Sequence, residues 1–285
     1  MNLTFDCYEC VIRQILLLAK DISDDDEKRR AVTREMLDHF QHNADRIVPP
    51  EMALHFFSIF SRETGITDPM REIKIKSTRL GLELLEEFRT QVNASDDPLK
   101  TAIRLSIGGN IIDYGVNPDF QLSDAANEIR KVLDMPYDHA ALDDLAKRIR
   151  SAKQVFYMLD NCGEAVLDRL VLENIPCKVV VGVRGKPIIN DVTRTEAAES
   201  GITGWEIVDT GVGAPGVLLD KAPKEFLDAI EKSSLVITKG QGNFESLESE
   251  LTSKPLYFLL RVKCKVIAKF LGAEMGSIQI LGRNL

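Results

Sequence analysis

The spacing of apolar residues changes near residue 150 and divides the chain into two parts. Before that point, apolar residues recur three to four positions apart, as in the face made by Leu80, Leu84 and Phe88. This spacing is typical of amphipathic helices. No stretch there reads convincingly as a strand, so we predict that residues 1–150 form an all-helical domain that caps the second part of the chain.

From residue 151 to residue 285, short apolar runs alternate with amphipathic ones. Such alternation indicates βαβ units and a mainly parallel sheet, and right-handed crossovers place helices on both faces of that sheet. We therefore predict a three-layer α/β/α, Rossmann-like domain over residues 151–285. Its expected strands are 154–159, 177–183, 205–208, 235–238 and 255–262, and its expected helices are 164–174, 193–200, 223–232, 244–251 and 265–271.

Oxygen-bearing side chains follow the first two predicted strands. Asp160 and Asn161 come directly after the first strand, and Asn190 and Asp191 precede the helix after the second. Ligands of open α/β sheets bind beyond the carboxyl ends of the strands, and carboxylate and amide oxygens suit Mg²⁺ or Mn²⁺. These residues are candidates for the two halves of a metal site. The alternative is that Asp160 only caps the following helix.

Lys239 directly follows the fourth predicted strand, and Gly240 comes next. A lysine is a compact cation for a phosphate group, and a glycine turn exposes backbone N–H groups to an anion. The alternative is a surface lysine beside a turn. A divalent ion at the neighbouring strand ends can polarise a phosphoryl oxygen and activate water. Together the strand ends indicate a site for phosphate chemistry.

Charge and cysteine content narrow the class of protein. The 285 residues include 36 basic and 44 acidic ones, which gives a formal net charge of −8. The chain therefore lacks the excess of basic residues that is typical of nucleic-acid-binding proteins. No apolar run has the length of a membrane span, and Asp6 and Glu9 make the N-terminus unlike a secretory signal. We expect a cytoplasmic protein whose partner is a small phosphorylated metabolite, not nucleic acid or a membrane. The sequence does not indicate the oligomeric state.

The five cysteines, an odd number, do not indicate a disulfide framework. Cys7 and Cys10 could bind a metal or form a redox pair. A structural zinc site usually needs four ligands, and Cys162, Cys177 and Cys264 contain no second closely spaced pair. We interpret Cys7 and Cys10 as an ordinary reduced pair at the start of a helix.

Several motifs together resemble the damage-control phosphatase family, and the resemblance spans nearly the whole chain. The motifs are D-C-Y-E-C at 6–10, G-G-N-I-I-D at 108–113, D-N-C-G-E at 160–164, I-N-D-V-T at 189–193 and K-G-Q-G-N-F-E at 239–245. The N-terminal Cys-x-x-Cys is similar to the prokaryotic, archaeal-type branch. The resemblance implies a phosphatase that depends on Mn²⁺, Co²⁺, Ni²⁺ or Mg²⁺ and hydrolyses sugar phosphates, phosphopantetheine and related or damaged metabolites.

The resemblance also implies roles for individual residues. It makes Asp160, Asn161 and Asp191 the ligands of one divalent cation and places Lys239 at the substrate phosphate, so that Asp160, Asp191 and Lys239 are the catalytic residues. The surrounding shell that binds substrate would contain Glu164, Asn190, Asn243 and Glu245. The glycine turn itself makes Gly240 a further candidate for binding the phosphate. Asn110 and Asp113, about one helical turn apart, would border the cleft; the alternative for them is a capping role at a helix end.

Three other functions use similar residues. A haloacid-dehalogenase-type phosphatase needs a second Asp two residues after the first, and here that position is Cys162. An S-adenosylmethionine-dependent methyltransferase would use a glycine-rich loop, and D-T-G-V-G-A-P-G at 209–216 offers one. A non-catalytic phosphometabolite-binding module could use the same strand ends to bind a phosphate without cleaving it.

Overall fold

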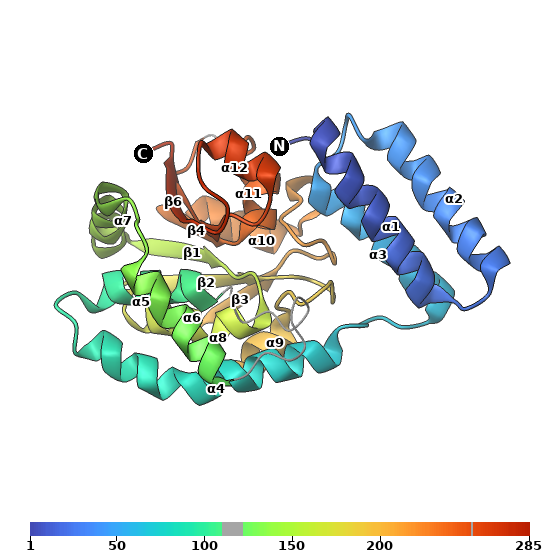
Figure 1. Ribbon diagram of the computed structural model, residues 1–285. Coiled ribbons are helices and arrows are strands. Elements are labelled where there is room, and N and C mark those ends of the chain that lie inside the picture. The colour runs from blue at the N-terminus through green and yellow to red at the C-terminus, as the bar shows by residue number, and fades with distance from the viewer. Residues whose placement is uncertain (110–121, 252) are drawn as a thin grey trace.

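The computed structural model describes residues 1–109, 122–251 and 253–285 (Figure 1). Its first half is helical, as the apolar spacing predicts. The helices are α1 (Tyr8–Ile22), α2 (Asp26–Asn43), α3 (Pro49–Thr64), α4 (Arg71–Asn93), α5 (Pro98–Gly108), α6 (Leu122–Asp134) and α7 (His139–Ser151). The second half contributes α8 (Cys162–Glu173), α9 (Arg194–Glu199), α10 (Lys224–Lys232), α11 (Gln241–Leu247) and α12 (Lys265–Leu271).

A six-stranded sheet lies at the centre of the second half, in the order β3-β2-β1-β4-β5-β6. Neighbouring strands are parallel except β5 and β6, which are antiparallel. Because β2 and β4 flank β1 on opposite sides, the chain reverses its direction of winding there, and such a switch point is where open α/β sheets bind ligands. The strands are β1 (Gln154–Met158), β2 (Lys178–Val183), β3 (Glu206–Asp209), β4 (Leu235–Lys239), β5 (Leu256–Arg261) and β6 (Ile278–Arg283).

Helices cover both faces of the sheet, which confirms the predicted α/β/α architecture. Side chains alternate between the two faces of a strand. Val155, Tyr157 and Leu159 therefore join a buried cluster with α4, α5 and α8, whereas Phe156 and Met158 join another cluster with α10, α11 and α12. Both faces of β1 are buried, which is why the strand is an almost continuous apolar run.

The N-terminal helices divide into two groups (Figure 1). Helices α1, α2 and α3 enclose an apolar cluster of their own, centred on Ile15, Met36 and Phe56. Helices α4 to α7 instead share the larger cluster with the sheet. At Gly81 of α4, an added Cβ would lie 2.9 Å from the Cβ of Val166 on α8, so the glycine allows these helices to pack closely. The domain boundary near residue 150 stays a prediction.

Five of the observed strands lie where the alternating pattern predicts strands. The sequence analysis did not predict β6, the antiparallel edge strand, and it placed α11 three residues too late, at 244–251 instead of Gln241–Leu247. Within the ranges that the structure describes, no helix is both long and apolar enough to span a bilayer.

Candidate active site

The two halves of the predicted metal site lie together. Asn161 and Asp191 form an isolated antiparallel bridge, and the backbone N–H of Val192 donates to the carbonyl oxygen of Asp160 over 2.9 Å. The loops after β1 and β2 are thus hydrogen-bonded to each other. This backbone pairing brings Asp160, Asn161, Asn190 and Asp191 to one point at the carboxyl edge of the sheet.

Strand register determines which residues meet there. Met158 of β1 pairs with Gly182 of β2 and with Thr238 of β4. Each of these three residues is followed, two positions later, by a residue of the site. Asp160 follows Met158, Arg184 follows Gly182 and Gly240 follows Thr238, so Asp160, Arg184 and Gly240 are neighbours along the carboxyl edge of the sheet.

The local backbone allows the strand ends to approach each other closely. Gly240 has a φ of +78°, and a Cβ added there would lie 2.0 Å from Oδ2 of Asp160. A larger residue would therefore collide with the Asp160 carboxylate. Ile189 has a φ of +33°, which is strained for a β-branched residue. This strained residue presents Asn190 and Asp191 to the site.

Arg184 is buried between the two carboxylates. Its Nε donates to Oδ2 of Asp191 over 2.6 Å, its Nη1 donates to Oδ1 of Asn243 over 2.8 Å, and its Nη2 lies 3.4 Å from Oδ1 of Asp160. The side chain has no exposed surface. The rigid fork of a guanidinium can hold several acceptors at once, so Arg184 fixes how the carboxylates of Asp160 and Asp191 are oriented.

The electrostatics of the site suit a divalent cation. Burial raises the pKa of Asp160 well above its usual range, and Asp191 and Glu164 raise it further. Burial also raises the pKa of Asp191, although Arg184 opposes this rise. A cation relieves such repulsion between carboxylates. Among the described residues, no group of three or more His, Cys, Asp or Glu side chains could hold a metal; the donors here would be two carboxylates and the Asn161 amide.

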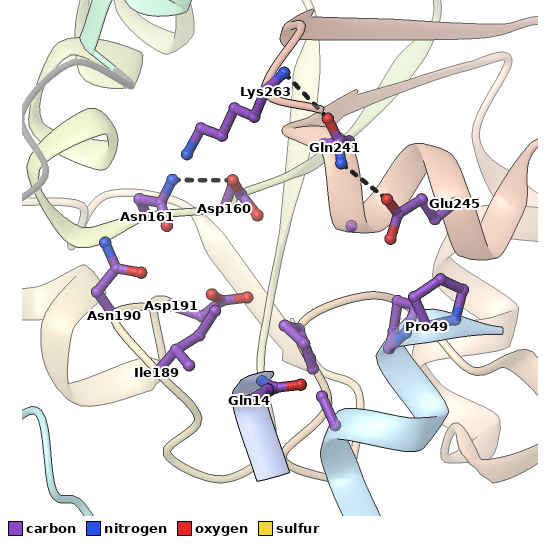
Figure 2. A pocket seen from close by; sticks show the side chains of 14 residues that line it. Gln14, Pro49, Asp160, Asn161, Ile189, Asn190, Asp191, Gln241, Glu245 and Lys263 are labelled. Carbon is purple, nitrogen blue, oxygen red and sulfur yellow. Dashed lines mark hydrogen bonds between the residues drawn. The ribbon is translucent and has the colours of Figure 1, made fainter. Parts of the chain in front are cut away.

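A cleft with a volume of about 270 Å³ opens at this point and is shown in Figure 2. The loops after β1 and β2 form one wall, and α11 with the segment after β5 forms another. The opposite wall comes from the N-terminal helices α1 and α3. The residues around the cleft are Gln14, Pro49, Pro50, Ala53, Asp160, Asn161, Ile189, Asn190, Asp191, Pro215, Gln241, Gly242, Glu245 and Lys263.

Lys239 lies behind this cleft and not on its wall. Its Nζ donates to Oε1 of Glu164 and Oδ1 of Asp168, both over 2.7 Å, and to the carbonyl oxygen of Ser106 over 3.2 Å. The hydroxyl of Tyr157 also donates to Asp168. The Lys239 side chain has no exposed surface. Lys239 and Glu164 therefore belong to a buried ion cluster between β4 and α8.

Asn243 also lies beneath the cleft. Its Nδ2 donates to the carbonyl oxygens of Lys239 and Leu159, over 2.7 and 3.3 Å, while its Oδ1 accepts from Arg184. Asn243 thereby links the ends of β1, β2 and β4. The predicted residues Asn110 and Asp113 fall outside the part of the chain that the structure describes.

The structure places Cys264 beside the N-terminal Cys-x-x-Cys. Burial raises the pKa of the Cys10 thiol, and Cys264 and Cys7 raise it further. The sulfur of Cys264 accepts hydrogen bonds from the side chain of Gln241 and the backbone N–H of Ile267. All five cysteines are free thiols.

Glu245, on the cleft wall, gives the protein a pH-dependent stability. Burial raises its pKa from 4.5 to about 7, although a 2.8 Å hydrogen bond from Gln241 and the charge of the N-terminal amine oppose the rise. The folded state therefore binds more protons than the unfolded chain between those two values, and stability falls as the pH rises through that window.

We expect the Glu245→Gln variant to lose part of this pH dependence. The fall in its free energy of unfolding between roughly pH 5 and pH 8, from urea titrations, should be smaller than in the parent protein. Glu250→Gln, which changes an exposed glutamate nearby, should reproduce the parent curve. An undiminished fall in Glu245→Gln would contradict this assignment.

Sequence reasoning missed two cations and two amides at the site. Arg184 follows a run of buried strand residues, and a charge placed there is a signal that could have been used. Lys263 lies just beyond the predicted end of the fifth strand, and Gln241 lies between the two glycines of the turn after β4. Both positions follow strand ends, and this is a signal that could have been used. Gln14 of α1 carries no local signal, because only the tertiary fold brings it to the cleft.

The chain matches the model of the damage-control phosphatase ARMT1-like domain over residues 4–278. A protein named damage-control phosphatase from Archaeoglobus fulgidus is 31% identical over 280 residues, covering 95% of this chain and 96% of that protein. An uncharacterized protein of Methanocaldococcus jannaschii is 29% identical over 292 residues, covering 98% and 94%. The crystal structure of a DUF89 family protein from Pyrococcus horikoshii matches with a TM-score of 0.88 and 26% identity over 100% of both chains.

Proposed function

Because the chain belongs to the family of the damage-control phosphatase ARMT1-like domain, we propose that it is a metal-dependent phosphatase. Its substrates would be phosphate monoesters of small metabolites, and its metal one divalent cation, Mn²⁺, Co²⁺, Ni²⁺ or Mg²⁺. The observation that carries this proposal is the meeting of Asp160, Asn161 and Asp191 at the switch point of the sheet.

The donor set fits the proposed ion. Asp160, Asn161 and Asp191 offer oxygen atoms, which hard divalent cations prefer. When bound, such an ion polarises a phosphoryl oxygen and lowers the pKa of water, which supplies a nucleophile at neutral pH. Arg184 would keep the two carboxylates turned towards the ion. The walls from α1 and α3 would limit the access of bulk water to the bound ester.

The size of the cleft favours sugar phosphates as substrates. A volume of about 270 Å³ lies just below the usual range of ligand pockets, roughly 300–1,000 Å³. A phosphorylated monosaccharide fits such a space better than the long arm of phosphopantetheine. The amides of Gln14, Asn190 and Gln241 can bind sugar hydroxyls, because an amide both donates and accepts hydrogen bonds.

A phosphate-release assay tests this function. The purified protein is incubated with sugar phosphates and phosphopantetheine, with each of the four cations and with a chelator. We expect release that requires an added cation and is faster for sugar phosphates. No release with any cation would refute the phosphatase. Bound S-adenosylmethionine would then favour a methyltransferase, and ligand binding without turnover would favour a non-catalytic module.

A further inference from the structure

We propose that Lys263, and not Lys239, is the cation that holds the phosphate group of the substrate. The proposal rests on the phosphatase function proposed above and assigns the phosphate position within the same cleft. It gives Lys239 a different task, which is to position α8 and the residues at its start.

The position of Lys263 is the first argument. It lies two residues after β5, is exposed and lines the cleft. In Figure 2 its side chain runs along the cleft wall, and its nitrogen end points towards Asn161 and Asp160. The backbone N–H of Lys263 donates to Oε1 of Gln241 over 3.1 Å. This bond ties the segment after β5 to α11 and holds the lysine beside the proposed metal ligands.

The charges around the cleft are the second argument. The carboxylates of Asp160 and Asp191 line the same cleft as Lys263. A phosphate monoester beside a divalent cation carries close to two negative charges at neutral pH. Within the described ranges, Lys263 is the one lysine or arginine on the cleft wall. It is therefore placed to neutralise the part of the phosphate charge that faces away from the ion.

The surroundings of the two other basic residues are the third argument. Arg184 is fully buried and holds Asp160, Asp191 and Asn243. Lys239 is fully buried as well, and its ammonium already has three acceptors. Turning that ammonium towards the cleft would leave the carboxylates of Glu164 and Asp168 buried without a cation, at a high cost.

Lys239 instead acts as a positioning residue. Glu164 lies in the first turn of α8, and Asp168 lies one turn further along the same helix. By binding both, Lys239 fixes the start of α8 against the end of β4. Asn161, a proposed metal ligand, is the N-cap of α8, so this clamp controls where its side chain lies.

Binding of inorganic phosphate to the metal-loaded protein tests the assignment without relying on turnover. Calorimetry with Mn²⁺ present compares the parent protein with Lys263→Ala, Lys263→Arg and the control Lys265→Ala, which removes an exposed lysine two residues away. A charged hydrogen bond contributes on the order of 1.5–3 kcal/mol, so we expect Lys263→Ala to weaken phosphate binding about 10–100-fold. Lys263→Arg should recover most of that affinity, and Lys265→Ala should match the parent.

The same measurements define failure. A loss of less than about threefold in Lys263→Ala, or no phosphate binding by the parent protein, overturns the proposal. Because Lys263 is exposed, its variants should keep the thermal midpoint of the parent and should still bind Mn²⁺. Lys239→Met should lower the thermal midpoint. The proposal is also overturned if Lys239→Met keeps the thermal midpoint of the parent and binds phosphate more weakly than Lys263→Ala does. Phosphate binding that depends on Lys263 in a protein that releases no phosphate would sustain this proposal and refute the phosphatase.

Discussion

An Asp160→Asn variant is expected to lose cation binding and phosphatase turnover together. The amide keeps the shape of the side chain and can still accept the hydrogen bond from Nδ2 of Asn161, which is 3.0 Å long in the parent protein. It removes one of the two charges that would bind the ion. Polarisation by a metal contributes several kcal/mol to a transition state, so kcat/KM should fall by about three orders of magnitude.

Two measurements separate binding from turnover in this variant. In the parent protein, Mn²⁺ at about 100 times its Kd should raise the free energy of unfolding by about 2.7 kcal/mol, and in Asp160→Asn the increase should disappear. Asp209→Asn is the matched control, because Asp209 also lies at a strand end but pairs with Arg194 and does not line the cleft. Cation-dependent turnover at the parent rate in Asp160→Asn would eliminate Asp160 as a ligand.

The alternation of apolar and polar runs was sufficient to predict the layers of the second half and the edge where the site lies. Because parallel strands end at one edge of a sheet, the sequence was enough to predict that Asp160 and Asp191 lie on the same side of the molecule. The distance between them depends on the register of β1 and β2 and on the pairing of the following loops. Neither is visible in a periodic pattern.

Lys239 shows what a strand end alone leaves undetermined. Side chains alternate along a strand, and Leu235, Ile237 and Lys239 have the same parity. Leu235 and Ile237 face the cluster that contains α8, so Lys239 faces α8 as well, where Glu164 and Asp168 receive it. The parity of Lys239 was available in the sequence. Its acidic partners on α8 became apparent only from the packing of that helix.

Arg184 was not predicted as a site residue, because its position directly after a strand does not indicate that its side chain is buried. A lysine or arginine directly after a strand is usually solvated, and a fully buried one is rare unless it is paired. Its partners Asp191 and Asn243 lie 7 and 59 residues further along the chain. Such a buried network is a property of the assembled strand ends, and no local motif in the sequence announces it.

An Arg184→Met variant is expected to be strongly destabilised when no divalent cation is present. Methionine fills much of the space of the arginine but removes the guanidinium that binds the buried carboxylates of Asp160 and Asp191. Removing one partner of a buried ion pair typically costs about 3–5 kcal/mol. The matched control is Arg194→Met, because Arg194 and Asp209 form a more exposed pair, and exposed pairs contribute about 0–1 kcal/mol.

Adding the cation makes this variant a test of the whole site. If Asp160 and Asp191 are ligands, an ion bound to them replaces the missing positive charge, so Mn²⁺ should restore part of the free energy of unfolding lost in Arg184→Met. Urea titrations with and without Mn²⁺ measure this recovery, and Arg194→Met should gain from Mn²⁺ only what the parent protein gains. Recovery requires both carboxylates, so the double variant Asp160→Asn, Arg184→Met should show none. A cation effect in Arg184→Met no larger than in the parent would mean that the arginine and the ion do not act on the same pair of carboxylates.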